Sequence, residues 1–245
     1  MDNAVYVGLS RQMMLRRELD IVANNIANSD TTGFKVESLM AKAQPLAPAV
    51  TQGGPRPVKF VADAGVARDF GQGALHRTEA PLDLGVEGNG FFKVSGPEGE
   101  RYTRDGHFRT DERGKLTTQG GMGVLDEGGG EIILDPEKGA VTIASDGTVS
   151  QGAERVGKVA VVRFEDRSVL EKDGDNLYRN TANLQPQAAP DARVRQGMLE
   201  SSNVRPIVEI TRMMEVTRAY ESMTRLVESE TDLARRTVER MGRVQ

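Results

Sequence analysis

The sequence predicts an α+β fold, in which amphipathic helices at the N- and C-termini flank a mainly antiparallel β domain. One observation is that apolar residues recur at helical spacing near both ends of the 245-residue chain. Another is that the middle of the chain alternates short apolar runs with glycine-containing turns, as antiparallel sheets do. Because neither helix can bury its apolar stripe alone, we expect coiled-coil-like pairing of the helices, with each other or with neighbouring copies of the chain.

Residues 1–35 form the first predicted region, a helix followed by an asparagine-rich loop. Asn24, Asn25 and Asn28 are unusual near a helix end, because asparagine amides compete for backbone hydrogen bonds. Two interpretations remain open, namely a frayed helix end or a set of exposed amides that contact another chain. The apolar stripe of this helix comprises Val5, Leu9, Met13, Leu15, Leu19, Val22 and Ile26.

Gly33 and Phe34 close this region. Glycine adopts a left-handed conformation without steric cost, so we expect Gly33 to turn the chain after the helix. Phe34 is then expected to fold back as an apolar anchor.

Residues 36–74 are predicted to be an extended connector. Pro45, Pro48, Pro55 and Pro57 exclude a long helix in this segment. We expect a short strand at residues 58–61. The remainder is either a disordered linker or an ordered strap along the next domain or a neighbour.

Residues 75–196 are predicted to be a β-rich domain. Short apolar runs occur at residues 82–86, 91–94, 141–143 and 159–164. Asp-Gly pairs at Gly106, Gly147 and Gly174 favour tight turns between strands. This pattern is typical of an antiparallel sandwich or a barrel-like domain.

Residues 197–245 are predicted to contain one long helix. Ser202 or Asn203 is a suitable N-cap, and Pro206 falls in the first turn, where a missing N–H costs little. A helix from there to about Met241 would be about 55 Å long at 1.5 Å per residue. Its apolar stripe comprises Ile210, Met213, Tyr220, Met223, Val227, Ala234, Val238 and Met241.

The composition excludes several kinds of function. Lys plus Arg number 32 against 36 Asp plus Glu, so the net charge of −4 argues against nucleic acid as a partner. The absence of cysteine excludes disulfides, thiol catalysis and cysteine-ligated metals. His76 and His107 lack metal-ligand spacing, and no nucleotide-binding or hydrolase motif occurs. We therefore expect no catalytic residue, cofactor, metal or small-molecule substrate, and no enzymatic activity.

The N-terminus lacks the basic and continuous apolar segments of a Sec signal peptide, so we expect none to be cleaved. We also expect no membrane-spanning segment, because that requires about 18 consecutive apolar residues.

Several motifs resemble those of flagellar rod and hook proteins, the axial subunits of the bacterial basal body. The longest is ANNIANSDTTGFK at residues 23–35, near the N-terminus. The others are PLDLGVEGNGFF at residues 81–92, YTRDGHF at residues 102–108 and GMLESSNV at residues 197–204. The resemblance covers residues 1–35, about 78–125 and 197–241, and it implies a β-rich domain outside a helical core.

The resemblance also implies a function, that of a structural rod subunit that polymerises helically through its terminal helices. Met1, Asp2 and Tyr6, with the modest chain length, look most like the proximal-rod members of the family. The alternative is a distal-rod or other hook or rod axial subunit, although the segment after Lys35 lacks the tyrosine-containing insertion usual in distal-rod proteins. The implied partners are other rod proteins, copies of the chain and the flagellar type III export apparatus. The implied location is the periplasmic rod of the basal body.

A rival hypothesis is a secreted β-domain hydrolase or carbohydrate-binding module with helical extensions. Such a protein needs paired carboxylates in a cleft and aromatic side chains that stack on sugars. Tryptophan is absent and aromatic residues make up only 4% of the chain, which disfavours this hypothesis.

The residues that we expect at the subunit interface share the apolar stripes and the two terminal motifs. They are Leu9, Leu19, Val22, Asn24, Asn25, Ile26, Asn28, Gly33, Phe34, Asn203, Ile210, Met213, Tyr220 and Met223.

Overall fold

The computed structural model describes residues 2–43 and 61–242, which form two compact units. The helical unit takes its described residues from the ranges 1–27, 37–68 and 205–245. The β unit comprises residues 28–36 and 69–204. The chain therefore passes between the two units four times, after residues 27, 36, 68 and 204.

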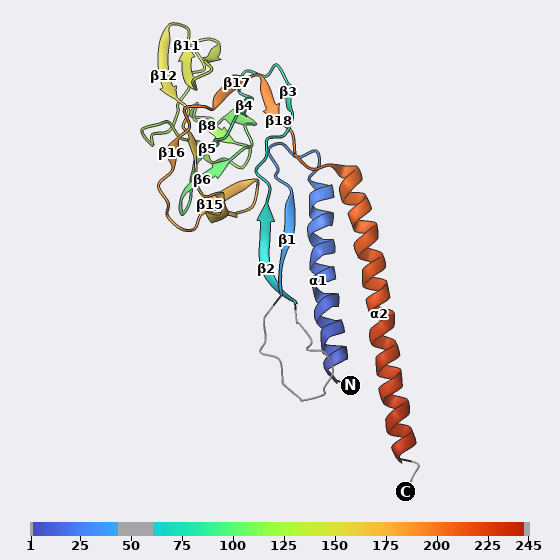
Figure 1. Cartoon of the computed structure of the whole chain (residues 1–245). Helices are drawn as coiled ribbons and strands as arrows, with labels where there is room; N and C mark the ends of the chain where they lie inside the picture. The colour runs from blue at the N-terminus through green and yellow to red at the C-terminus, as the bar shows by residue number, and fades with distance from the viewer. Residues whose placement is uncertain (1, 44–60, 243–245) are drawn as a thin grey trace. The chain divides into compact units, whose positions relative to one another are not determined.

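The helical unit contains two helices and a two-stranded hairpin (Figure 1). Helix α1 spans Asp2–Ala27 and helix α2 spans Pro206–Gly242, with Pro206 in the first turn as predicted. Strands β1 (Glu37–Ala43) and β2 (Val61–Arg68) pair antiparallel, with a register shift between Leu39 and Ala41. No described helix is long and apolar enough to cross a membrane.

Helices α1 and α2 lie side by side and run antiparallel (Figure 1). Gln12 in α1 donates a hydrogen bond to the hydroxyl of Thr224 at 3.1 Å. Further along α1, Glu18 accepts a hydrogen bond from Nε of Arg212 at 2.9 Å. Residue numbers in α2 thus fall as those in α1 rise, which defines the antiparallel direction.

The two helices approach closely where α1 has a glycine. A Cβ atom built on Gly8 would lie 2.7 Å from Cγ2 of Val227, so the missing side chain makes room for that valine. Around this crossing, the α2 residues that are half-buried or buried recur every three or four positions. They are Met213, Val216, Thr217, Tyr220, Met223, Thr224 and Val227.

The β unit is built from short strands whose described pairings are all antiparallel, which confirms the predicted α+β class. The strands are β3 (Leu75–Arg77), β4 (Leu84–Glu87), β5 (Phe91–Gly96), β6 (Gly99–Thr103), β7 (Phe108–Thr110), β8 (Leu116–Thr118), β9 (Gly123–Val124), β10 (Val141–Ile143), β11 (Thr148–Gln151), β12 (Glu154–Lys158), β13 (Val161–Arg163), β14 (Leu170–Lys172), β15 (Leu177–Asn180), β16 (Gln187–Ala188), β17 (Arg193–Gln196) and β18 (Met198–Glu200). A single 3₁₀ turn, η1 (Arg167–Val169), precedes β14 in this part of the chain.

Strand β5 is the centre of the main sheet. The sheet has the order β14-β15-β6-β5-β9-β8-β7, and β13 joins both β5 and β16. Strands β10, β11 and β12 form a separate three-stranded sheet. The pairs β4–β17 and β3–β18 bring the last strands of the unit back to its first ones.

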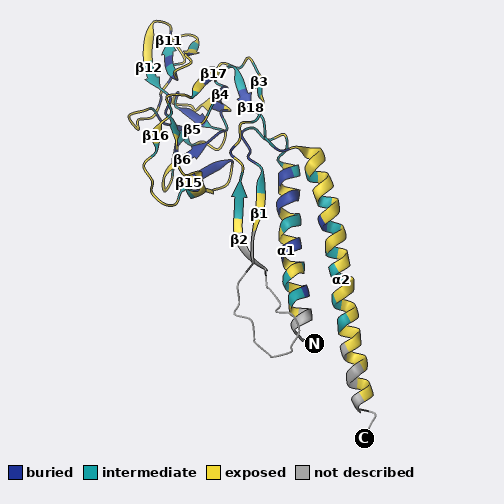
Figure 2. Cartoon of the chain, viewed as in Figure 1, coloured by how far each residue is buried: buried dark blue, intermediate teal, exposed yellow. Residues whose placement is uncertain are grey.

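The core of the β unit has two apolar clusters. Buried residues of its strands are drawn dark blue in Figure 2. In strand β5, Phe91 and Phe92 point to opposite faces, because side chains alternate along a strand. Phe92 belongs to the larger cluster, where its ring lies 5.1 Å from that of Phe108. Phe91 belongs to an aromatic cluster with Phe70, Tyr102, Phe164, Leu170 and Tyr178.

The compact units divide the chain differently from the predicted ranges 1–35, 36–74, 75–196 and 197–245. Residues 28–35 and 197–204 fold with the β unit, although the predicted ranges grouped them with the terminal helices, and residues 36 and 69–74 of the predicted connector also belong to it. The predicted connector contains β1 and β2, which pair with each other. Residue 61 of the predicted strand at 58–61 begins β2, and residues 58–60 lie outside the described part.

The predicted N-cap of the C-terminal helix was wrong. The helix begins at Pro206, so neither Ser202 nor Asn203 stands at its N-cap position. The Ser202 hydroxyl instead accepts a hydrogen bond from the Val204 amide at 3.2 Å. The Asn203 side chain binds backbone groups of the β unit, and this long-range use outweighs the local capping preference.

Phe92→Ala tests the larger core cluster. Phe92 is fully buried, so removing its ring leaves a cavity, and we expect the free energy of unfolding to fall by about 3–5 kcal/mol. Ile133→Ala is the matched control, because Ile133 is 59% exposed and its loss should change stability by less than about 0.5 kcal/mol. Urea denaturation of the full-length variants measures both effects, and equal midpoints for the two would contradict the assignment of Phe92 to the core.

Candidate functional site

The residues predicted to form a subunit interface differ widely in exposure. The exposed ones are Leu9, Asn24 and Ile210. The half-buried ones are Leu19, Ile26, Asn28, Asn203, Met213, Tyr220 and Met223. The buried ones are Val22, Asn25, Gly33 and Phe34. The buried residues pack inside the chain's own units, so they can only position an interface and not form its surface.

Asn25 shows why an asparagine stands near the end of α1. Its side chain is 1% exposed and forms a two-way hydrogen bond with the backbone of Glu37, donating at 2.7 Å and accepting at 2.9 Å. The same amide nitrogen donates to the carboxylate of Glu209 in α2 at 3.0 Å. Asn25 thus links α1, β1 and α2 within the helical unit, whereas the sequence left open an exposed amide that contacts another chain.

The loop that follows α1 is an integral part of the β unit. Gly33 has a φ of +69°, as the sequence predicted, and its amide donates to the Glu200 carbonyl at 2.7 Å. Phe34 is 1% exposed, with the Lys172 ammonium 4.6 Å from its ring centroid. Asn176 donates to the carbonyl of Thr32 at 2.9 Å. This loop is therefore held by the backbone and side chains of β-unit residues distant in sequence.

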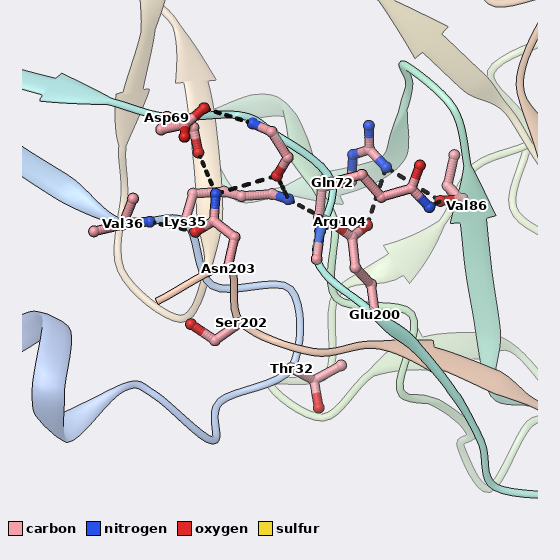
Figure 3. A network of polar contacts seen from close by, with 12 residues as sticks. Thr32, Lys35, Val36, Asp69, Gln72, Val86, Arg104, Glu200, Ser202 and Asn203 are labelled. Carbon is pink, nitrogen blue, oxygen red and sulfur yellow. Dashed lines mark hydrogen bonds and ion pairs between the residues drawn. The ribbon is translucent and has the colours of Figure 1, made fainter. Parts of the chain in front are cut away.

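The most unusual feature of the β unit is a buried group of three charges, the ion triad Lys35–Glu200–Arg104 (Figure 3). One carboxylate oxygen of Glu200 lies 2.5 Å from Nζ of Lys35, and the other lies 3.0 Å from Nη1 of Arg104. All three residues are at most 2% exposed. Charges this deeply buried persist only when they are paired and hydrogen-bonded.

Backbone groups bind most of the donors and acceptors that the triad leaves free, whereas Nε of Arg104 has no hydrogen-bond partner in the described residues. Lys35 also donates to the Gly71 carbonyl at 2.7 Å, and the Gly73 amide donates to Glu200 at 2.8 Å. Arg104 donates through Nη2 to the Gly88 carbonyl at 2.7 Å. Two cations face one carboxylate, so these carbonyl oxygens stabilise the excess positive charge.

Burial and pairing act in opposite directions on both cations. Burial lowers the pKa of Lys35, while the neighbouring Glu200 carboxylate opposes that shift. Burial likewise lowers the pKa of Arg104, again against the effect of Glu200. Glu200 therefore favours the charged form of both side chains in an environment that disfavours charge.

Asn203 completes this junction with a second set of hydrogen bonds (Figure 3). Its carbonyl oxygen accepts from the Val36 amide at 2.8 Å, and its amide nitrogen donates to the Asp69 carbonyl at 2.8 Å. The Asp69 amide in turn donates to the Val36 carbonyl at 3.0 Å. The segments entering the β unit after α1 and leaving it before α2 are thus bound to a third segment at residues 69–73.

Lys35, Arg104 and Glu200 were not among the predicted site residues, although each lies inside one of the motifs at residues 23–35, 102–108 and 197–204. The sequence gives only a local indication that these charges are buried, because each of two of them adjoins an apolar residue. Lys35 directly follows Phe34, and Glu200 directly follows Leu199. Their pairing spans 165 and 96 residues of sequence and could not be read from spacing.

The two histidines take part in peripheral contacts. His76 lies 3.0 Å from the Ser201 hydroxyl at an exposed position, and Nε2 of His107 lies 4.0 Å from the Asp83 carboxylate. Within residues 2–43 and 61–242, no group of three or more histidine or carboxylate side chains is arranged to hold a metal ion.

Three family models match separate parts of the chain. Residues 5–35 match a model described as "Flagella basal body rod protein". Residues 85–151 match "Flagellar hook protein FlgE/F/G D1 domain", and residues 195–240 match "Flagellar basal body rod FlgEFG protein C-terminal". The ion triad takes one residue from each of the three matched segments, Lys35, Arg104 and Glu200.

Full-length relatives agree with these matches. The chain is 58% identical over 244 residues to the flagellar basal-body rod protein FlgF of Caulobacter vibrioides, with 100% of both chains covered. It is 32% identical to FlgF of Mesorhizobium japonicum over 99% of both chains. It is also 30% identical to the flagellar basal-body rod protein FlgG of Bacillus subtilis, over 96% of this chain and 97% of the relative.

Glu200→Gln tests the ion triad. A glutamine keeps the shape but has one acceptor oxygen, so it turns an N–H donor toward Lys35 or Arg104 and leaves both cations without a counter-charge. We expect the free energy of unfolding to fall by about 3–5 kcal/mol. The control is Glu87→Gln, since Glu87 pairs with Arg195 at 2.7 Å where both side chains are nearly half exposed. Its loss should cost less than about 1 kcal/mol. Similar losses in the two variants would mean that the triad contributes no more than a surface pair.

Gly33→Ala tests the turn after α1. A Cβ atom at Gly33 would lie 2.5 Å from the Asp105 amide nitrogen, in addition to the strain of a positive φ. Gly121→Ala is the matched control, because Gly121 also has a positive φ but has no atom within 4 Å of the added Cβ. We expect about 1 kcal/mol of destabilisation at Gly121 and about 1–3 kcal/mol more at Gly33, measured by thermal unfolding. Equal losses would show that the backbone relaxes around the new methyl group.

Proposed function

The chain belongs to the family of flagellar basal-body rod proteins, and on that basis we propose that it forms the proximal part of the rod by helical polymerisation through its terminal helices. The chain is a structural subunit of the flagellar basal body. Beyond this structural role, we propose that the chain builds the proximal part of the rod and that its terminal helices make the subunit contacts. The alternative from the sequence analysis is a distal-rod or other hook or rod axial subunit.

The observation that carries the proposal is an exposed apolar face on each terminal helix. On α1, Tyr6, Leu9 and Met13 are 63%, 42% and 73% exposed. They follow a spacing of i, i+3 and i+7, which places them on one face of the helix. They line an open groove of about 720 Å³ together with Arg16 and Arg17.

Helix α2 repeats the same pattern near its N-terminus. Ile207, Ile210 and Met214 are 81%, 46% and 49% exposed, again at i, i+3 and i+7. Apolar side chains gathered on one face of a helix mark a surface for protein contact. Two different faces on one subunit allow heterologous contacts, which repeat along a helix or filament when they do not close into a ring.

The remaining parts of the proposal follow from family membership. The subunit's partners are other components of the flagellar basal body. We propose that these include copies of the chain itself, and that the flagellar type III apparatus exports the chain without a cleaved signal peptide. Assembly then takes place in the periplasm. The proposed role is structural, without catalysis, and requires no cofactor, nucleic acid or small-molecule substrate. The matching family models are those of rod and hook proteins, which argues against the hydrolase hypothesis.

Met13→Asp and Met214→Asp test these two faces. Both side chains are exposed in the subunit, so each variant should fold with unchanged stability to within about 0.5 kcal/mol. In an assembled rod, each aspartate would be an unpaired buried charge that costs several kcal/mol. Since about 1.4 kcal/mol corresponds to a factor of ten, we expect at least a tenfold loss of the subunit from purified basal bodies, with loss of motility.

Ala219→Asp is the control for this experiment, because Ala219 is exposed on another face of α2. It should assemble and support motility as the unaltered protein does. Leu19 and Ile26 are less suitable positions, because both are half-buried within the subunit and a charge there would also disturb the fold. Wild-type amounts of both methionine variants in basal bodies would remove these faces from the proposed contacts.

A further inference from the structure

The β unit contains a cavity of about 340 Å³ that is rich in arginine. Arg104, Arg163 and Arg167 line it, together with the aromatic rings of Phe91 and Phe164. Glu165 is the one acidic side chain among its lining residues, and its carboxylate accepts a hydrogen bond from Gln187 at 2.9 Å. The cavity therefore carries an excess of positive charge.

The positive charges of Arg163 and Arg167, the two exposed arginines of the cavity, are poorly compensated by nearby carboxylates. Arg163 is 44% exposed, and its nearest carboxylate, on Asp191, is 3.8 Å away and 89% exposed. The guanidinium of Arg167 is exposed and has no ion pair or side-chain hydrogen bond among the residues that the structure describes. Their donors are thus available to a ligand entering from solvent.

The third arginine lies at the inner wall. Arg104 is 2% exposed, and its Nε is the one buried side-chain nitrogen or oxygen in the described residues without a hydrogen-bond partner. Burial lowers the pKa of Arg104, and the nearby positive charge of Arg167 acts in the same direction. An anion between these side chains would relieve that repulsion, which Glu200 relieves only from the triad side.

The chemistry of the lining indicates the ligand. A guanidinium presents a planar fork of donors that matches a carboxylate, and Arg104 already binds one, Glu200. The rings of Phe91 and Phe164 offer apolar walls for the carbon chain that carries such a group. A cavity of about 340 Å³ has room for one such side chain.

We propose that this cavity is a carboxylate-binding site, which receives an aspartate or glutamate side chain of a neighbouring protein chain in the assembly. That the carboxylate comes from a neighbouring chain rests on the proposed function. That the cavity binds a carboxylate does not. The assembly would thereby gain a polar contact on the β unit in addition to the helical faces.

The binding test uses the full-length protein labelled with ¹⁵N at arginine. Acetate is titrated against chloride at constant ionic strength, while the Nε–H resonances are followed by NMR. We expect saturable shifts that report millimolar binding at Arg163 and Arg167. The Arg104 Nε–H should report the same binding, and in the double variant R163Q/R167Q, which lacks the other two resonances, it should report binding at least tenfold weaker.

The matched control is R179Q, since Arg179 is 47% exposed and also pairs loosely, with Glu171 at 3.5 Å. It should bind acetate as the unaltered protein does. Shifts that stay linear in acetate, or an Arg104 shift that is equal in the protein and the double variant, would overturn the site.

A second experiment identifies the source of the carboxylate. The charge reversal R163E/R167E should reduce the amount of subunit in purified basal bodies at least fivefold, with R179E unaffected. Normal incorporation together with lost acetate binding would overturn a neighbouring chain as the source and indicate a free small anion. If Met13→Asp and Met214→Asp assemble normally while R163E/R167E does not, the helical contacts of the proposed function fail and the carboxylate site stands.

Discussion

The Glu200 carboxylate is the contact on which the junction of the β unit depends. It pairs with Lys35, directly after the loop that follows α1, and with Arg104, between β6 and β7. Glu200 itself ends β18, shortly before the chain enters α2. A buried carboxylate with two cationic partners tolerates no loss of any of them, because the remaining charge would be left without compensation. Polar groups satisfied in this way specify one arrangement of the chain more sharply than apolar packing does.

The pairing of Glu200 explains why two segments far apart in the sequence must fold together. Residues 28–36 and 197–204 both belong to the β unit and bind residues 69–73 through Lys35 and Asn203. The three family models cover the three sources of the ion triad, so the matched segments meet in one junction although they are far apart in sequence.

Some apolar residues of the helical unit are buried within the subunit, and others are exposed to solvent. Leu15, Val22 and Val216 are buried in the subunit, whereas Met13 and Ile207 remain exposed. The contact between α1 and α2 buries one apolar stripe of each helix. The proposed contacts with neighbouring subunits therefore need additional apolar residues outside that stripe. The arginine-lined cavity would add a contact of a different kind, since charge complementarity favours correct registration more than it favours affinity.

The sequence by itself determined the two terminal helices, the α+β class, the positions of strands such as β5 and β10, and the family. These follow from local periodicity, turn residues and contiguous motifs, which need no knowledge of distant contacts. Only the tertiary structure decided that residues 28–36 fold with the β unit, that Asn25 is buried, and that Asn203 does not cap α2. It also decided which apolar side chains of the helices stay exposed. The physical reason is that the burial of a charge or an amide depends on distant partners, 165 residues away for Lys35 and 184 for Asn25, and spacing along one helix or strand carries no information about them.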